Sequence, residues 1–200
     1  GKMFESIRAA KHSVCIQFYI LRSDVSGSLL GDLLCLKAKE GVKIYVIYDE
    51  IGSNSLQRSY IKRLKNAGVQ ISPFNSSRHL RTRMQINFRN HRKLVVCDGE
   101  TAYVGGYNFA DEYLGTGKVL PFWRDTHLKI EGPAALSFQI IFCEDWHWAT
   151  HELPNLHWPD PVTKGTDKVM SIASGPADKI DSASLYFTHL IQTAKKRCWL

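Results

Sequence analysis

The 200-residue chain contains no run of about 18 apolar residues, which excludes an ordinary membrane-spanning helix within it. Its five cysteines are an odd number and include no Cys-x-x-Cys pair, and four of them lie in apolar runs. Such cysteines are typical of buried, reduced thiols, so we expect a reducing compartment. The chain starts with Gly1 and not with methionine, so we expect a processed or excised form, and the absence of a leader carries little weight.

Acidic residues are absent from one long stretch of the chain. Residues 51–97 hold no Asp or Glu but ten Lys and Arg residues. The rest of the chain has 16 basic and 19 acidic residues, so the whole net charge of +7 comes from this stretch. A basic excess concentrated in one place predicts a surface that attracts anions, and both nucleic acid and anionic lipid headgroups fit.

Apolar runs and turn residues alternate along the chain in a way that predicts an α/β layered domain. The periodicity predicts helices over 4–11, 28–40, 56–66 and 133–150, and strands over 14–20, 42–48, 69–72, 93–97, 101–104 and 127–131.

A break in this pattern predicts the domain organisation. Residues 151–165 hold three prolines and little periodicity, which is typical of a linker. We predict a strand over 168–173, a helix over 182–194 and a strand from 198 onward. The sequence of residues 191–200 resembles that of residues 7–16, since both continue from a predicted helix end through Ala-Lys into a predicted strand. We therefore expect one repeat over 1–150, a linker over 151–165, and the truncated start of a second repeat over 166–200.

One motif carries the chemistry. His91 and Lys93 are two apart in a predicted strand, so their side chains point to the same face and place a nucleophile beside a fixed positive charge. Asn108, with the glycines Gly105 and Gly106, can complete a cradle for a phosphate. An enzyme that attacks a phosphodiester must neutralise its oxygens and supply a placed nucleophile. The motif therefore predicts phosphodiester cleavage or exchange, with a covalent phosphoryl intermediate on His91.

Asp98-Gly99 between two apolar strands predicts a hairpin. A two-residue loop places His91 opposite Gly106, where the missing side chain leaves room for a tetrahedral group, and Lys93 opposite Val104. A three-residue loop would instead turn Asn108 to the other face. Asp98 itself is either a motif carboxylate or only a turn residue.

The ordered combination His-x-Lys-x4-Asp, followed by Gly-Gly-x-Asn, resembles the signature of the phospholipase D superfamily. The surrounding sequence resembles bacterial-type cardiolipin synthases in particular, over residues 87–93 (NFRNHRK), 105–113 (GGYNFADEY) and 123–133 (WRDTHLKIEGP). The similarity extends over nearly the whole chain. It implies a phospholipase D-like layered α/β/α fold with a mixed central sheet, of which this chain holds one repeat and the first elements of a second.

The resemblance also implies the activity. It implies a phosphatidyltransferase that joins two phosphatidylglycerols into cardiolipin and glycerol, without a metal or cofactor. His91 would be the nucleophile, Lys93 and Asn108 would bind phosphate, and Asp125 would be the carboxylate that orients the histidine, with Glu112 as second choice. We count Asp98 with these catalytic residues, and we expect Gly105, Gly106, Arg89, Arg92 and Glu112 to contact the substrate. The implied location is the cytoplasmic side of a bacterial inner membrane, against anionic phospholipid.

The chain departs from the family pattern because it has no second His-x-Lys. The second motif would lie beyond Leu200, so the isolated chain would lack its general acid and be inactive. The alternatives are a nuclease of the same superfamily that doubles its single motif by dimerisation and binds nucleic acid, or a non-catalytic, lipid-binding fragment.

Two further features have simpler interpretations. His147 and His151 have helical spacing for a metal pair, but a polar helix end explains them better. Five aromatic residues form either a membrane-interface rim or part of the core, and we favour the core except for Phe122 and Trp123. These five are Phe122, Trp123, Trp146, Trp148 and Trp158.

Overall fold

The computed structural model describes residues 1–74, 89–114, 122–163, 165–175 and 180–199. Their helices are α1 (Lys2–Ala9), α2 (Val25–Lys39), α3 (Arg58–Asn66), α4 (Ala134–Thr150) and α5 (Ser182–Thr193), with a short 3₁₀ turn η2 (Asp111–Leu114). The strands are β1 (Ser13–Phe18), β2 (Lys43–Tyr48), β3 (Gln70–Pro73), β4 (Leu94–Cys97), β5 (Thr101–Gly105) and β6 (His127–Glu131). Among the helices of these ranges, none combines the length and apolar character that crossing a bilayer requires.

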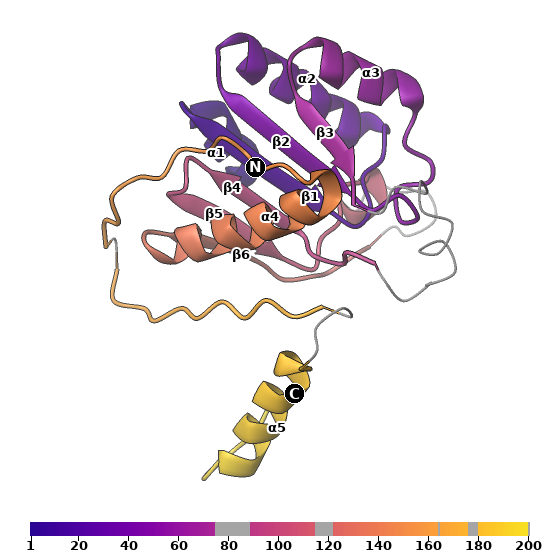
Figure 1. Ribbon diagram of the computed structural model, residues 1–200. Coiled ribbons are helices and arrows are strands. Elements are labelled where there is room, and N and C mark those ends of the chain that lie inside the picture. Colours follow the sequence, from indigo (N-terminus) through magenta and orange to yellow (C-terminus); the bar gives the residue numbers. More distant parts are fainter. Residues whose placement is uncertain (75–88, 115–121, 164, 176–179, 200) are drawn as a thin grey trace.

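The six strands form one sheet in the order β3-β2-β1-β4-β5-β6. The pairs β1–β2 and β2–β3 are parallel, and the pairs β1–β4, β4–β5 and β5–β6 are antiparallel. Helices α1, α2 and α3 cover one face, and α4 covers the other (Figure 1). The predicted α/β/α layers and the mixed sheet are therefore confirmed.

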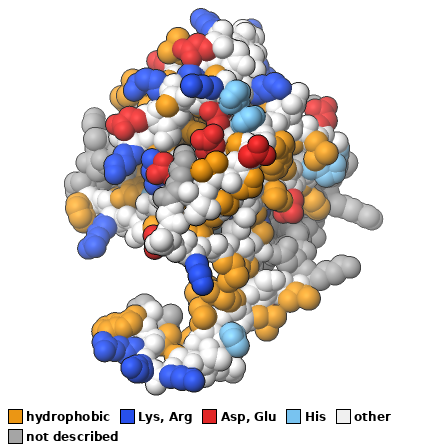
Figure 2. Space-filling view, turned by 90° about the vertical axis from the view of Figure 1, so that its left-hand side faces the viewer, with side chains coloured by type: hydrophobic (Ala, Val, Ile, Leu, Met, Phe, Trp, Pro, Cys, Tyr) orange, Lys and Arg blue, Asp and Glu red, His pale blue; other side chains and the backbone are white. Residues whose placement is uncertain are grey.

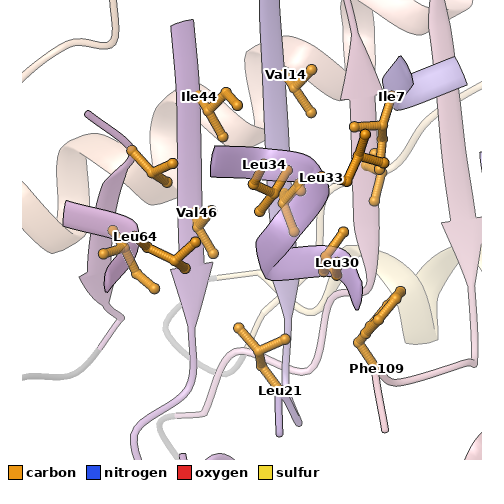
Figure 3. Close-up of a cluster of buried hydrophobic side chains, with 14 of the residues drawn as sticks. Ile7, Val14, Leu21, Leu30, Leu33, Leu34, Ile44, Val46, Leu64 and Phe109 are labelled. Carbon is orange, nitrogen blue, oxygen red and sulfur yellow. The ribbon is translucent and has the colours of Figure 1, made fainter. Parts of the chain in front are cut away.

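Central strand β1 shows why the sequence folds in this way. All six of its residues are buried. Val14 packs in the cluster beneath α1 and α2 (Figure 3), as do Ile16 and Phe18, while Cys15 packs in the separate cluster beneath α4. A strand buried on both faces needs apolar residues in consecutive positions, and this is why the run has no polar alternation.

The β4–β5 hairpin differs from the predicted geometry. Leu94 pairs with Val104 and Cys97 with Thr101, so the loop is one residue longer than predicted. Asp98 and Gly99 do adopt positive φ angles of 54° and 70°. The Glu100 carbonyl, however, accepts a hydrogen bond from the Gly132 N–H (3.1 Å) and so takes part in the β6 side of the sheet.

Burial gives the reason for this register. Val95 and Tyr103 belong to the cluster under α1 and α2, and the observed register pairs them with each other. A two-residue loop would have paired each with a residue that faces α4, because a one-residue slip turns side chains to the other face.

The segment after α4 is extended. Residues 155–157 of this segment are held against β2 and α4, since the Asn155 N–H donates to the Tyr45 hydroxyl (2.9 Å) and Gln139 of α4 donates to the His157 carbonyl (2.8 Å). The strand predicted over 168–173 is not present, and 198–199 are not in a strand. A strand needs neighbours to satisfy its backbone hydrogen bonds, and these residues have no sheet beside them.

The helix predicted over 182–194 is confirmed as α5, but it stands apart from the sheet (Figure 1) and buries none of its residues. Figure 2 shows hydrophobic side chains gathered over this lower part of the molecule. They include Leu185, Phe187, Leu190 and Ile191, each more than 40% exposed.

Candidate functional site

His91, Tyr19 and Lys93 form the centre of the candidate site. The His91 imidazole is exposed on one side and stacks on the Tyr19 ring on the other, with ring centroids 3.9 Å apart. The Lys93 ammonium lies 5.5 Å from the centroid of the same Tyr19 ring and donates to the His91 carbonyl at 2.6 Å. Arg89 donates to the Tyr19 hydroxyl at 3.1 Å. One tyrosine therefore contacts His91, Lys93 and Arg89.

The surroundings of His91 favour its neutral form. The contact with Tyr19 removes water from one face of the ring, and this burial is the main reason why the pKa of His91 lies below its ordinary value. The positive charge of Lys93 lowers the pKa further, while the carboxylate of Asp49 opposes the shift. A neutral imidazole is the form that can attack phosphorus.

Asp49 and Tyr19 were missed by the sequence analysis. Asp49 is buried directly after β2, where its carboxylate accepts hydrogen bonds from the backbone of Ile51, Gly52 and Asn90. It therefore fixes the residue before His91. The signal was available, because Tyr19 and Asp49 follow two adjacent parallel strands, and the carboxyl ends of such strands are where open α/β sheets place their sites.

Lys93 lies near Asp125, at the edge of the sheet between β5 and β6. Burial lowers the pKa of Lys93, and the Asp125 carboxylate partly offsets this effect. Asp125 is not among the groups that shift the pKa of His91, whose carboxylate neighbour is Asp49. The structure thus brings Asp125 together with Lys93.

The two glycines of the motif are needed for the close approach of the β6 side. A Cβ atom on Gly106 would collide with the Asp125 carboxylate, and one on Gly105 would collide with the Thr126 carbonyl. The space beside Gly106, expected to receive a phosphate, is filled by the Asp125 side chain. The physical reason is the pairing of β5 with β6, which places Gly105 opposite His127 and so brings Asp125 against Gly106.

Asn108 is tied to the end of β1. Its Oδ1 atom accepts a hydrogen bond from the Ile20 N–H at 3.0 Å, next to Tyr19. The neighbouring Phe109 N–H donates to the Ile20 carbonyl at 2.9 Å. With Oδ1 engaged by the backbone, the amide group is the part of Asn108 that can donate to an anion.

Asp98 is not brought together with His91. It lies at the opposite end of β4, where its carboxylate accepts 2.8 Å hydrogen bonds from the backbone N–H groups of Lys11, His12 and Ser13. It thus joins the β4–β5 turn to the start of β1. In this position Asp98 stabilises the strand that carries the motif and does not contact the reacting group.

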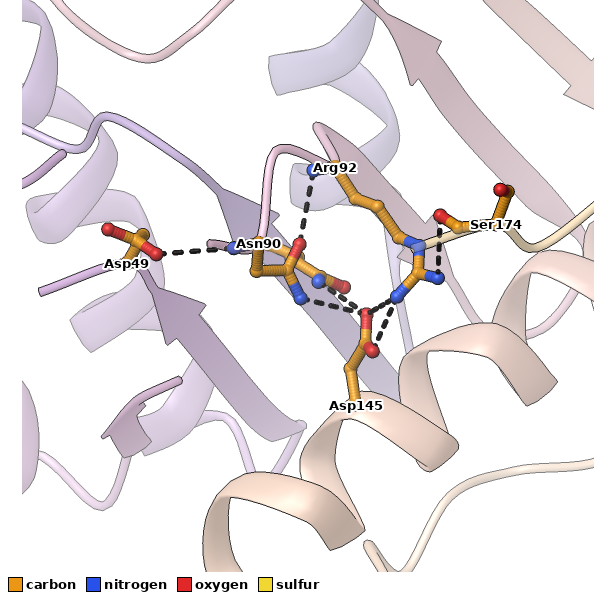
Figure 4. Close-up of polar contacts among 6 residues, drawn as sticks. Asp49, Asn90, Arg92, Asp145 and Ser174 are labelled. Atoms are coloured by element: carbon orange, nitrogen blue, oxygen red, sulfur yellow. Dashed lines mark hydrogen bonds and ion pairs between the residues drawn. The ribbon is translucent and has the colours of Figure 1, made fainter. Parts of the chain in front are cut away.

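Arg92, expected to contact substrate, is engaged elsewhere. It points to the α4 side of the sheet and forms an ion pair with Asp145 at 2.5 and 2.6 Å (Figure 4). Asp145 also accepts hydrogen bonds from Gln17 (2.6 Å) and Asn90 (3.0 Å). Arg92 donates in addition to the Ser174 carbonyl at 3.3 Å. Its side chain also lines the pocket that opens beside His91, so the guanidinium is held by Asp145 at the wall of that pocket.

The other expected contacts are divided. Arg89 remains beside His91 through Tyr19, whereas Glu112 forms an ion pair with Arg22 at 3.1 Å. Three of the ten basic residues of the 51–97 stretch, Arg78, Arg81 and Arg83, lie outside the described residues. A pocket of about 310 Å³ opens beside His91, and its walls include Phe74, Trp148 and Ser174.

No metal centre is built by the residues that the structure describes, since they hold no group of three His, Cys, Asp or Glu side chains placed for an ion. The His147 and His151 rings, 6.4 Å apart, lie at the end of α4 as the simpler interpretation has it. Trp146 is buried in the core, but Trp148 and Trp158 are exposed, so the core assignment of these two was wrong.

Comparison with known proteins decides the family. Residues 3–118 match the family model described as cardiolipin synthase, PLD-like domain. The chain belongs to this phospholipase D-like family. Among its relatives is cardiolipin synthase A from Pseudomonas putida (strain W619), which is 46% identical over 198 residues. That alignment covers 99% of this chain but 41% of the relative, so the chain spans less than half of that protein's length.

Solved structures share the fold. Nuc from Salmonella typhimurium, described as a phospholipase D family member, superposes with a TM-score of 0.52 at 19% identity, over 74% of this chain and 86% of that chain. The phosphatidylserine synthase of Haemophilus influenzae Rd KW20 gives a TM-score of 0.54 at 18% identity, over 72% of this chain and 33% of that chain.

The contact between Tyr19 and His91 predicts a measurable pKa change. Tyr19→Leu exposes the second face of the imidazole, so the pKa of His91 should rise toward its ordinary value. Lys93→Met should raise it too, because a positive charge is removed. Titration of the His91 ring protons by NMR measures both. Lys39→Met, at the end of α2, is the control and should leave the pKa unchanged. A His91 pKa that does not respond to Tyr19→Leu would contradict the stacked geometry.

Proposed function

We propose that this chain is the first half of a phosphatidyltransferase of the cardiolipin synthase type. The proposal depends on the exposed His91 imidazole, whose lowered pKa favours the neutral form. The Lys93 ammonium lies beside it, and Asn108 lies at the end of the neighbouring strand β1. The family membership and the relatives named cardiolipin synthase A support the choice of substrate.

The proposed reaction has two steps. A ring nitrogen of His91 attacks the phosphorus of one phosphatidylglycerol, an N–P bond forms, and the glycerol oxygen leaves with its bonding pair and takes up a proton from a general acid. A hydroxyl of a second phosphatidylglycerol then attacks the phosphohistidine. The N–P bond breaks, cardiolipin is released, and the hydroxyl proton passes to the base that was formerly the acid.

The motif residues have distinct parts in this scheme. The Lys93 ammonium and the Asn108 amide would bind the phosphate oxygens and stabilise the charge that develops on them. Asp125 would hold Lys93 in its charged form, and Asp49 would hold the backbone before His91 and favour the imidazolium as the leaving alkoxide forms. Asp98 would act at a distance, by anchoring β4. The scheme requires neither a metal nor a cofactor.

The remainder of the scheme depends on sequence outside these 200 residues. A second His-x-Lys would supply the general acid, and the unit that begins within residues 166–200 would bring it to His91. The anionic substrate would be met at a membrane surface, on the cytoplasmic side of a bacterial inner membrane. The chain by itself would therefore bind phosphate without turning over.

The test is the product formed by the full-length protein. Incubated with phosphatidylglycerol vesicles, it should produce cardiolipin and glycerol in equal amounts, without added metal and in the presence of a chelator. The comparison reaction contains duplex DNA in place of lipid. Cleavage of DNA that falls steeply with salt, without cardiolipin formation, would instead support the nuclease alternative.

A further inference from the structure

A second hollow, of about 670 Å³, lies on the sheet face that α1 only partly covers, over β5 and β6. Its walls are largely aromatic and apolar, and include Met3, Tyr103, Phe109, Tyr113, Phe122 and Trp123. This volume is in the range of roughly 300–1,000 Å³ that is usual for small-molecule sites. Phe122 is 79% exposed at its edge, so an apolar surface continues outward from the hollow.

The hollow is connected to the candidate site through two residues. Asn108 lies in its wall. The Oδ1 atom of Asn108 accepts a hydrogen bond from the backbone next to Tyr19, and the Tyr19 ring stacks on His91. Trp123 also lies in the wall, and its indole N–H donates to Asp125 at 3.4 Å. The hollow therefore starts at the group expected to hold the phosphate.

The charges of the hollow are arranged by depth. His127 lines it with both ring nitrogens buried and without hydrogen-bond partners in the described part of the chain. Burial lowers the pKa of His127, which keeps the ring neutral. The charged residues of the wall are Lys2 and Lys129, both exposed, and Lys129 forms an ion pair with Glu131 at 3.1 Å. An uncharged, largely apolar interior suits the hydrocarbon part of a ligand.

We propose that this hollow holds one acyl chain of the phospholipid whose phosphate lies against His91. The proposal rests on the proposed function and adds where the donor's apolar part is bound. A chain in this place would fix the phosphate with respect to the imidazole from a distance. The acyl chain is chosen over a protein segment because Asn108, the residue proposed to bind the phosphate, lies in the wall of the hollow, so the apolar part of a lipid held there by its phosphate would extend into it.

The experiment uses full-length protein and two matched substitutions. Phe122→Gln places a polar group at the edge of the hollow, and Leu128→Gln makes the same kind of change at an exposed residue of β6 on the opposite face. Each buried methylene is worth about fourfold in binding. Phe122→Gln should therefore lower kcat/KM for dioleoyl-phosphatidylglycerol at least fivefold and leave the value for the dihexanoyl lipid unchanged. Leu128→Gln should change neither.

A crosslinking measurement separates this proposal from the proposed function. Phosphatidylglycerol with a diazirine at the end of one acyl chain should label Tyr103, Phe109 or Trp123 after irradiation, whether or not cardiolipin is formed. Cardiolipin formation without label in the hollow would overturn the acyl-chain site alone. Equal loss on both lipids with Phe122→Gln, together with a lowered melting temperature, would also overturn it, and would assign the hollow to packing against the rest of the protein.

Discussion

His91→Gln in the full-length protein is expected to reduce cardiolipin formation by at least about 10³-fold while leaving the fold unchanged. The loss should be large because the glutamine amide cannot form the covalent phosphoryl intermediate, and removal of a nucleophile commonly costs this much or more. The fold should tolerate the change because the side chain is exposed and its main contact is one face of Tyr19. Initial rates on phosphatidylglycerol vesicles and the melting temperature measure the two effects.

His12→Gln is the matched control for this experiment. His12 is also exposed and also stacks on an aromatic ring, that of His157 at 4.1 Å, but it lies at the other end of β1, beside Asp98. It should keep full activity. Radiolabelled phosphatidylglycerol should leave label on the wild-type protein and on His12→Gln but not on His91→Gln. Transfer that survives His91→Gln would show that the nucleophile lies elsewhere.

Asp145→Ala is expected to lower the free energy of unfolding by about 3 kcal/mol, because it leaves the partly buried Arg92 guanidinium and two buried amides without their acceptor. Asp145 is only 6% exposed and accepts from Arg92, Gln17 and Asn90. Since Asn90 precedes His91, activity should fall as well. Urea denaturation of the 200-residue chain measures the stability.

Asp32→Ala provides the comparison for Asp145→Ala. Asp32 forms an ion pair with Arg63 at 2.6 Å, similar in length to the pair between Asp145 and Arg92, but its side chain is 65% exposed. Exposed pairs contribute about 0–1 kcal/mol. If Asp145→Ala cost no more than Asp32→Ala, the network around Asp145 would not be the part that joins β4 to α4.

The sequence predicted the layers of the fold well because burial acts locally in this chain. The mainly apolar sequence of β1 and the helical periodicity before Gly41 each specify an element without reference to distant residues. The hairpin register could not be predicted from the local sequence. Asp98-Gly99 does form a tight turn, but the role of Glu100 depends on a backbone partner at Gly132, which no local pattern reveals.

The candidate site shows the same division. His91 and Lys93 were predicted from spacing, and both contact Tyr19. The three-residue loop was expected to turn Asn108 to the other face, but Asn108 lies beyond the end of β5, where strand alternation no longer applies, and it binds the backbone next to Tyr19. The stacking of Tyr19 and the backbone anchoring by Asp98 join residues more than 70 positions apart, so neither follows from local sequence. The pairing of Arg92 with Asp145 joins residues 53 positions apart, so it too could not be read from local sequence, and a contact between Arg92 and substrate stays a prediction.

The position between the histidine and the lysine of the motif has its own constraint. Arg92 joins three parts of the molecule, because it lies between the reactive pair just before β4, pairs with α4 through Asp145, and donates to the Ser174 carbonyl of the C-terminal segment. A displacement of that segment would be transmitted to the neighbouring imidazole within one peptide unit. If the chain is the first half of a larger transferase, as proposed, the residue between the histidine and the lysine would couple the position of the C-terminal segment to that of the imidazole.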